Sequence, residues 1–299
     1  MKSFFLLISV LCFFVQFTCL SLDTVDGEGK QYWQNNQISA EGYFESGLLQ
    51  GKGKIYHSNG VINKEGSFKD GKLTGEGKIF DNKGNLEEEG EFFEGRLQGN
   101  GKKYWNGELR EVGTFFEGEL YGLGKKYEFT NNLIEEGTFE FGRLEGSGKK
   151  YHENGRVSEE GEFRNGRLSG IGKKYHENGR VYQEGEFMQG YLGGKGKIYN
   201  TDGKLLAEGD FAYDYYVEPG HDKTFLNGRG KKYNLSGKIL EVGEFHYGKL
   251  HGKGKRYHPN GNLMEEGIFS SGYLHGKGKR YDHFGKLYES GTFYYGKLQ

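Results

Sequence analysis

Residues 170–187 read GIGKKYHENGRVYQEGEF, and this short stretch decides the fold of the whole chain. Its Gly-x-Gly-Lys opening occurs eleven times, with first glycines at positions 27, 51, 75, 99, 122, 146, 170, 194, 228, 252 and 276. The spacing is 24 residues except for one interval of 23 and one of 34. Self-similarity at a fixed period of this length is typical of a repeat array. We therefore expect residues 22–299 to form one repeat array.

Two glycine-containing turns divide each unit into two short strands. The repeat tyrosine is followed by Asn178-Gly179, a dipeptide that favours a two-residue hairpin turn. Nine units carry Gly at the second position of this turn and two carry Asn, which best replaces Gly at positive φ. The second turn, Asn165-Gly166, follows the repeat phenylalanine. The predicted turn glycines include Gly155 and Gly179 in the first turn, and Gly166 and Gly190 in the second.

Two-residue turns fix the register of the strands, and the register fixes their faces. The predicted opposite pairs are Lys173 with Glu184, Tyr175 with Tyr182, Phe163 with Leu168, and Gly161 with Gly170. One face should carry the aliphatic, phenylalanine and glycine positions, with an aromatic ring of a neighbouring strand lying on bare glycine backbone. The other face should carry ladders of lysine, glutamate and tyrosine. The sequence thus predicts an all-β, elongated, single-layer antiparallel meander of repeated β-hairpins.

The composition excludes several classes of protein. Glycine contributes 54 of 299 residues, a bias shared with linkers, but aromatic residues make up 16% and need to be buried. Lys and Arg number 41 against 42 Asp and Glu, so no strongly basic field exists to hold nucleic acid. The Gly-x-Gly-Lys motif does not match a phosphate-binding loop, because Lys173 is followed by Lys174 and no unit has Ser or Thr there.

The first 21 residues differ sharply from the array. Lys2 precedes the apolar run FFLLISVLCFFV, and small residues follow near Ser21. This arrangement is typical of a secretory signal peptide. The largely apolar stretch reaches roughly to Leu22, so an uncleaved N-terminal anchor is the alternative. We expect the chain to enter the secretory pathway and to be secreted or membrane-anchored. Both cysteines, Cys12 and Cys19, lie in this segment, so a cleaved chain has no disulfide and no thiol chemistry.

The unit EGEFRNGRLSGIGKKYHENG, residues 160–179, resembles the MORN repeat (membrane occupation and recognition nexus). The resemblance rests on Gly161, Phe163, Gly166, Gly170, Gly172, Tyr175 and Gly179. It implies a MORN-type half-pipe solenoid and a scaffold role at membranes, cilia or cytoskeletal structures. In some relatives the repeats precede a catalytic domain, whereas here the array fills the chain from residue 22. The period of 24 departs by one residue from the usual unit.

The repeated ladders supply candidate binding residues. The tyrosine ladder suits an aromatic-lined groove for a protein partner, and its other interpretation is packing along the array. The lysine ladder suits an anionic phospholipid surface, and its other interpretation is neutralisation by glutamates of the neighbouring strand. Histidines recur at fixed places in the pattern, so we interpret them as strand surface residues. We therefore expect no metal, no cofactor and no catalytic residue. The candidates are Tyr151, Tyr175 and Tyr199 for a partner, and Lys149, Lys173 and Lys197 for lipid.

One hairpin breaks the period. The insertion at about residues 212–227 is ten residues longer than its counterparts and gathers aromatic residues beside Pro219. Insertions in repeat proteins often lie on the binding face, so we expect a lengthened hairpin that contacts a protein partner. A tolerated surface loop is the alternative. The candidate contact residues are Tyr213, Tyr215, Tyr216, His221 and Phe225.

The sequence therefore leads to two hypotheses of function. The leading one is a non-catalytic scaffold for protein–protein interaction in the secretory pathway or at a membrane surface. The alternative is a peripheral binder of anionic phospholipids through the lysine and tyrosine ladders. An apolar sheet face that its own side chains cannot fully cover would also suit a homodimer. The identity of the partner does not follow from the sequence.

Overall fold

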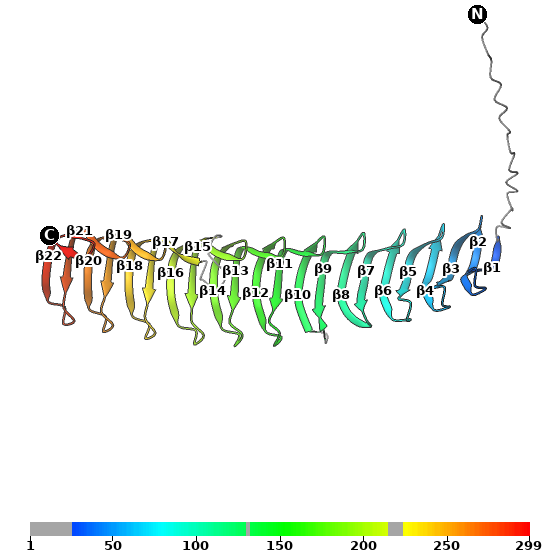
Figure 1. Ribbon diagram of the computed structural model, residues 1–299, viewed down its shortest axis with the longest axis horizontal. Helices are drawn as coiled ribbons and strands as arrows, with labels where there is room; N and C mark the ends of the chain where they lie inside the picture. The colour runs from blue at the N-terminus through cyan, green and yellow to red at the C-terminus, as the bar shows by residue number, and fades with distance from the viewer. Residues whose placement is uncertain (1–25, 130–131, 215–223) are drawn as a thin grey trace, which may run out of the picture.

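The protein is an elongated single sheet. A computed structural model describes residues 26–129, 132–214 and 224–299. Its strands lie side by side in chain order, from β1 at the N-terminal end to β23 at the C-terminal end (Figure 1). Neighbouring strands are antiparallel throughout, so the chain forms an open meander of hairpins. The predicted all-β, single-layer architecture is confirmed.

The strands are eight to ten residues long, except for shorter ones at the two ends. Their bounds are β1 Gly27–Tyr32, β2 Ile38–Glu45, β3 Leu48–Tyr56, β4 Ile62–Lys69, β5 Lys72–Phe80, β6 Leu86–Phe93, β7 Arg96–Trp105, β8 Glu108–Phe116, β9 Glu119–Glu128, β10 Asn132–Glu140, β11 Arg143–Tyr151, β12 Val157–Arg164, β13 Arg167–Tyr175, β14 Val181–Met188, β15 Tyr191–Tyr199, β16 Leu205–Tyr213, β17 Thr224–Tyr233, β18 Ile239–His246, β19 Lys249–Tyr257, β20 Leu263–Ser270, β21 Tyr273–Tyr281, β22 Leu287–Tyr294 and β23 Lys297–Leu298.

The turn between β12 and β13 has two residues, as predicted. Asn165 (φ 50°) and Gly166 (φ 73°) both have positive φ, which is the requirement of a type I′ turn. Gly190 has the same place in the next unit, with a φ of 86°. The Gly166 N–H donates to the Leu144 carbonyl of the preceding hairpin at 2.8 Å. This edge of the sheet is therefore hydrogen-bonded from one unit to the next.

The turn after the repeat tyrosine is longer than predicted. The Gly179 N–H donates to the His176 carbonyl, and the His176 N–H donates to the Arg180 carbonyl, so three residues form the loop. Gly179 has the predicted positive φ (83°), whereas Asn178 does not. The unit with the 23-residue interval has a true two-residue turn at Asn106-Gly107, with φ of 51° and 80°. The missing residue of that unit is therefore the third residue of this loop.

The longer turn changes the register beside it. Lys173 lies opposite Glu184, as predicted. Tyr175 lies opposite Val181, not opposite Tyr182, because a β-bulge separates this pair from the rest of the ladder. The error in the sequence-based register thus follows from the one extra loop residue.

A second bulge lies in the middle of each hairpin, where two glycines face each other. Gly161 lies opposite Gly172, not opposite Gly170 as predicted. The methyl groups of Leu168 lie 2.8 and 3.1 Å from the place where a Cβ of Gly172 would stand. Four residues of an extended strand span about 13 Å, so this contact requires the strand to bend sharply toward its leucine. A leucine of the same strand, not an aromatic ring of a neighbouring one, therefore covers the glycine backbone.

The bend buries two rows of side chains along the length of the sheet. The phenylalanines are 1–5% exposed and the leucines 0–3%. Because one chain buries both rows by itself, the apolar face gives no reason to expect a homodimer, which stays an untested prediction. The rows are Phe44, Phe68, Phe92, Phe115, Phe139, Phe163, Phe187, Phe211, Phe245, Phe269 and Phe293, and Leu49, Leu73, Leu97, Leu120, Leu144, Leu168, Leu192, Leu226, Leu250 and Leu274.

Replacing a glycine in the middle of a hairpin should destabilise the protein far more than replacing a glycine in a turn. Both Gly185 and Gly190 have positive φ, of 141° and 86°. A Cβ on Gly185 would lie 2.2 Å from the Lys195 carbonyl oxygen, whereas a Cβ on Gly190 would meet nothing within 4 Å. We expect Gly190→Ala to lower the free energy of unfolding by about 1 kcal/mol and Gly185→Ala by about 3 kcal/mol. Urea denaturation measures both, and equal losses would contradict the proposed clash.

Candidate functional site

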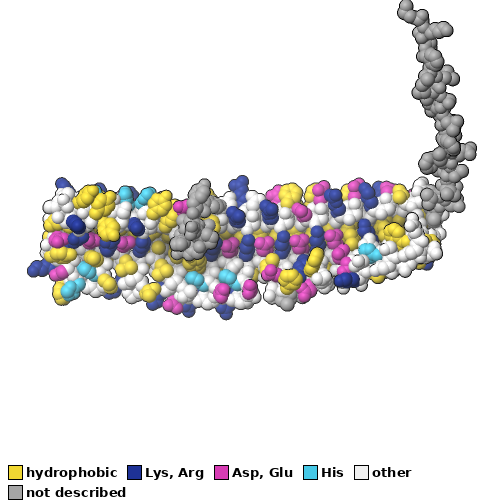
Figure 2. Space-filling view, viewed as in Figure 1, with side chains coloured by type: hydrophobic (Ala, Val, Ile, Leu, Met, Phe, Trp, Pro, Cys, Tyr) yellow, Lys and Arg dark blue, Asp and Glu magenta, His cyan; other side chains and the backbone are white. Residues whose placement is uncertain are grey.

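One face of the sheet carries a ladder of lysines and glutamates that alternate from strand to strand, which we call the groove ladder. Lys173 on β13 lies in register with Glu160 on β12 and Glu184 on β14. Acidic and basic side chains alternate along the sheet (Figure 2). The groove ladder contains Lys30, Lys54, Lys78, Lys102, Lys125, Lys149, Lys173, Lys197, Lys231, Lys255 and Lys279, and Glu41, Glu65, Glu89, Glu136, Glu160, Glu184, Glu208 and Glu266.

Tyrosines bind the glutamates of this ladder. The Tyr199 hydroxyl donates to Glu184 at 2.6 Å, and Lys197 Nζ lies 3.4 Å from the same carboxylate. The carboxylate therefore joins one unit to the next. The same hydrogen bond connects Tyr56 to Glu41, Tyr104 to Glu89, Tyr151 to Glu136, Tyr175 to Glu160, Tyr233 to Glu208, and Tyr281 to Glu266.

The hydrogen bonds shift the acidity of both partners. The bond from Tyr199 holds the pKa of the Glu184 carboxyl below its usual range. Burial, together with the bond to Glu41, raises the pKa of Tyr56 to about 12. Glu184 is thus charged and Tyr56 neutral across the physiological range. Tyr151, Tyr175 and Tyr199, the predicted partner-binding tyrosines, are engaged in contacts within the sheet.

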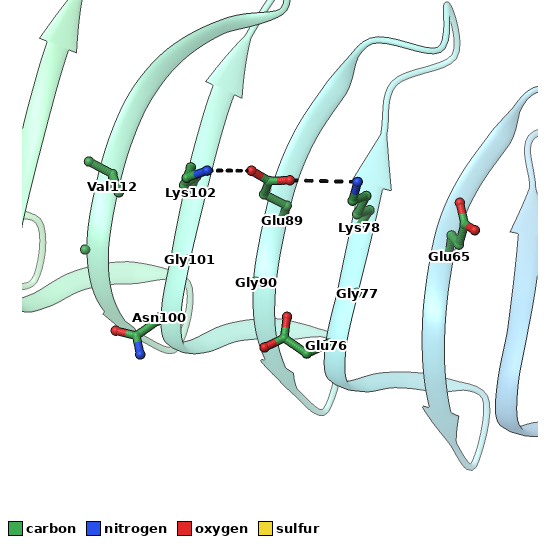
Figure 3. Close-up of a pocket in the computed structure, with 11 residues that line it drawn as sticks. Glu65, Glu76, Gly77, Lys78, Glu89, Gly90, Asn100, Gly101, Lys102 and Val112 are labelled. Carbon is green, nitrogen blue, oxygen red and sulfur yellow. Dashed lines mark hydrogen bonds and ion pairs between the residues drawn. The ribbon is translucent and has the colours of Figure 1, made fainter.

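A shallow groove runs beside the ladder, with glycine backbone as its floor. In the close-up, Lys78, Glu89 and Lys102 form one wall, and Glu76 and Asn100 belong to the other (Figure 3). Five hollows of about 620 to 950 Å³ repeat this arrangement along the sheet. The groove is open, so it suits an elongated ligand better than a small molecule that must be enclosed.

The predicted lipid-binding lysines lie in the wall of this groove. Each is in register with a glutamate on both neighbouring strands, and Lys197 forms an ion pair with Glu184. Binding of lipid by these lysines stays untested. The pairs are Lys149 with Glu136 and Glu160, Lys173 with Glu160 and Glu184, and Lys197 with Glu184 and Glu208.

The sequence analysis missed a second ladder, on the face of the buried rows, which we call the core ladder. Lys174 Nζ lies 3.0 Å from Glu159 and 6.0 Å from the centre of the Phe187 ring. Toward the C-terminus arginine replaces lysine, and Arg256 pairs with Glu265 at 2.7 Å. Glu265 is only 5% exposed. The signal was the basic doublet after the glycines, whose second residue points to the opposite face from the first.

The histidines that begin the three-residue turns link successive units, whereas the sequence predicted strand surface residues. His176 Nε2 lies 3.2 Å from the Tyr199 carbonyl oxygen of the next unit. Asn178 in the same turn donates to the Thr201 carbonyl at 2.7 Å. Both side chains therefore link successive turns. The equivalent histidines are His57, His152 and His258.

The base of the insertion extends one hairpin beyond its neighbours. Tyr213 on β16 pairs with Thr224 on β17, past the point where the other hairpins turn. The Tyr213 ring stacks on Tyr191, with 5.5 Å between ring centres, and Phe225 stacks on Tyr247 at 4.9 Å. Two predicted contact residues thus join an aromatic surface. Three others lie outside the described residues: Tyr215, Tyr216 and His221.

The edge formed by the type I′ turns changes character along the chain. Near the N-terminal end it carries ion pairs, such as Lys72–Glu94 at 3.6 Å, and one small aromatic cluster around Tyr121. From β15 onward aromatic residues and histidines dominate, and they gather along the upper margin of Figure 2. We call this set the aromatic edge. It contains Tyr191, Tyr213, Phe225, His246, Tyr247, His251, Tyr273, His275, Tyr294 and Tyr295.

Metal-ligand clusters and membrane-spanning helices are absent from the residues that the structure describes. Within residues 26–129, 132–214 and 224–299, no group of three His, Cys, Asp or Glu could hold a metal ion. In the same part of the chain, no helix is long and apolar enough to cross a membrane. The groove and the aromatic edge carry rows of charged, hydroxyl and aromatic groups.

No curated protein matches the chain. Among solved structures, it is similar to a chain of "Crystal Structure of TcdB2-TccC3-Cdc42", at 12% identity and a TM-score of 0.14. That alignment covers 79% of this chain and 16% of the other, so this chain spans a small part of the longer protein. A similarity at this level bears on neither fold nor function.

Two family models match the repeats directly. The model described as MORN repeat matches residues 65–85, 89–107, 160–179, 184–204 and 242–263. The model described as MORN repeat variant matches residues 25–46, 49–70, 144–165 and 274–293. The matches together cover more than half of the chain and fall on the hairpin units described above. The chain belongs to the MORN-repeat family.

Proposed function

We propose that this protein is a non-catalytic scaffold that holds a protein partner on its aromatic edge. MORN repeats are binding modules generally associated with protein or membrane-lipid interactions. The observation that carries the proposal is the exposure of this edge: Tyr247, Tyr273 and Tyr294 are 60%, 58% and 59% exposed. Clustered exposed aromatics are a hallmark of protein interfaces, where they bury large area at low entropic cost.

The long hairpin adds specificity to this surface. Its two base aromatics, Tyr213 and Phe225, stack on edge residues of the hairpins on either side. The hairpin is therefore continuous with the aromatic edge. A partner that binds the edge would also meet the insertion, and the insertion is absent from the other ten units.

The lipid hypothesis has weaker support. Each lysine singled out for lipid stands between two glutamates, which reduces its attraction for a negatively charged membrane surface. Among the described residues of the aromatic edge, no comparable neighbours offset the attraction of the exposed rings for a protein partner. We therefore place protein binding ahead of lipid binding.

Partner capture should depend on the aromatic edge. Immobilised residues 22–299 would be compared with a Tyr247→Ser, Tyr273→Ser, Tyr294→Ser variant, with captured proteins identified by mass spectrometry. Ser suits the turn position of Tyr247, because Ser46 and Ser271 fill the equivalent place with positive φ. We expect the variant to lose its specific partner at least tenfold, since interface aromatics contribute about 2 kcal/mol or more. A second variant replaces residues 212–227 with the six residues of Arg164–Ser169.

Two controls separate binding from folding. Glu94→Ser with Glu117→Ser changes the same turn position in the charged part of the edge and should leave capture unchanged. The melting temperature of every variant should stay close to that of the parent, because nearest-neighbour stacking survives on both sides. Full capture by the tyrosine variant and by the shortened hairpin would overturn the proposal.

The ladder tyrosines, in contrast, should matter for stability. Tyr199→Phe removes the donor to Glu184, whereas Tyr127→Phe is a matched control, because Val112 replaces the glutamate of that unit. We expect Tyr199→Phe to lower the free energy of unfolding by about 1 kcal/mol and Tyr127→Phe to change it much less. Partner capture should be equal for both. Loss of capture with unchanged stability in Tyr199→Phe would instead place the ladder in the binding surface.

The same pair predicts a pH dependence. The folded pKa of Glu184 lies below its ordinary value of 4.5, so the bond stabilises the fold above that pH. Its contribution is lost as the pH falls through the folded pKa. The difference in stability between the parent and Tyr199→Phe should therefore shrink below about pH 4.5. A difference that stays constant down to strongly acidic pH would contradict this assignment.

We also propose that residues 1–21 direct the chain into the secretory pathway. The support is the apolar run after Lys2, which ends near the small residue Ser21. Expression of the whole chain in a secreting eukaryotic cell tests this. Mass spectrometry should find a secreted protein that begins at Leu22, or an uncleaved protein in the membrane pellet. A full-length protein in the cytosol would contradict the proposal.

A further inference from the structure

The charge of the groove changes from one end of the sheet to the other. At the N-terminal end, the first hollow is lined by three lysines and four glutamates. In the middle, a hollow has three of each. The next has five cations and three acids, and the last, over β18 to β22, has four lysines and one glutamate. The C-terminal part of the groove is therefore a cationic channel, although the chain as a whole is nearly neutral.

Uncharged residues at four places, together with two lysines of the second wall, create this imbalance. Val242 and Ser290 occupy places where eight of eleven units have the glutamate of the groove ladder. Ile268 and Thr292 occupy places on the second wall where five of eleven units have an acid, namely Glu91, Glu162, Glu186, Asp210 and Glu244. Lys253 consequently lies opposite Ile268, and Lys277 lies opposite Thr292. Lys253 and Lys277 themselves occupy a place on the second wall where other units have residues such as Glu28, Glu76 or Leu123.

The one remaining carboxylate already has its partners. Glu266 lies 3.3 Å from Lys255 Nζ and 3.7 Å from Lys279 Nζ, and it accepts a hydrogen bond from Tyr281 at 2.7 Å. It does not reach the other wall, where Lys253 and Lys277 stand exposed. Along that wall Glu244 lines the adjacent hollow, which Lys253 also lines, whereas the hollow over β18 to β22 has no acid on this wall.

We propose that the C-terminal groove, lined by Lys253, Lys255, Lys277 and Lys279, binds an acidic, extended peptide segment. Charge complementarity identifies the ligand as anionic. The apolar side chains Val242 and Ile268 in the same hollow point to a polypeptide, because a lipid headgroup would use only the lysines. Ser290 and Thr292 add hydroxyl groups beside bare glycine backbone, which suits main-chain hydrogen bonding.

The spacing of the lysines also matches an extended chain. Lys253 is on β19 and Lys277 is on β21, two strands apart. Strands are about 4.8 Å apart, so the two lysines repeat at about 9.6 Å along the groove. A polyproline II segment returns a side chain to the same side every three residues, about 9.3 Å. A peptide with an acid at every third position would thus meet successive lysines.

The test uses a fluorescein-labelled peptide that has Glu at every third position and Val beside it. Fluorescence anisotropy with residues 22–299 should show binding at low salt that weakens as salt rises. The same peptide with Gln in place of Glu should bind at least about tenfold more weakly. Lys253→Glu with Lys277→Glu should weaken binding of the Glu peptide by a similar factor, whereas Lys52→Glu, at the equivalent place near the N-terminal end, should not.

A second variant tests whether a loss of peptide binding is due to misfolding. Val242→Glu with Ser290→Glu restores the glutamate that most units have, between lysines that lie in register with it. It should abolish peptide binding while keeping or raising the melting temperature, because Tyr257 gains the usual acceptor. The aromatic-edge variant should bind the peptide normally, so failure here and failure of the proposed function are distinguishable.

Several results would overturn the proposal. One is the absence of binding of the Glu peptide. Another is an equal loss with Lys52→Glu, which would show that net charge alone is responsible. A third is binding of vesicles that contain phosphatidylserine, sensitive to Lys253→Glu with Lys277→Glu, without binding of the peptide. That outcome would assign the groove to a lipid surface.

Discussion

The contact between each leucine and the glycine four residues further along its strand controls the rest of the structure. A single-layer sheet exposes both faces to water, so it has no core unless it bends. Leu168 packs on Gly172, where a Cβ would leave no room for its methyl groups. The bend brings the leucine opposite Phe163 and buries both. Repeated in the successive hairpins, this contact gives an elongated molecule a continuous core.

The sequence alone predicts the parts of this fold that follow from turn residues or from the alternation of side chains along a strand. The type I′ turn at Asn165-Gly166 and the Lys173–Glu184 pair follow from turn chemistry and alternation. The bulges do not follow, because each unit offers two glycines, Gly170 and Gly172, as partners for Gly161, and only the bend decides between them. The core ladder, in contrast, could have been predicted, because the second lysine of each doublet points to the opposite face from the first.

The sequence alone did not decide between two interpretations of the repeated tyrosines, a binding groove and packing along the array. A residue present in nearly every unit is one that each unit needs for its neighbour, which favours packing. Tyr199 shows this, because its hydroxyl is occupied by Glu184. The surfaces that differ from unit to unit are the better guide. Val242 in the groove and Tyr247 at the turn were both readable as departures from the period.

The two binding surfaces share the same C-terminal units, and their separation is fixed by the chain. Tyr247 at the edge and Lys253 in the groove lie on either side of β19's first residues. Hydrogen bonds between successive turns and between ladder residues on neighbouring strands join these units to one another. A partner anchored on the edge would therefore hold an attached acidic segment at high effective concentration above the cationic groove, and two weak contacts would combine into a much tighter one. A linear array favours this arrangement, because replacing surface residues in a few units changes what the array binds without altering the leucine–glycine contact that folds it.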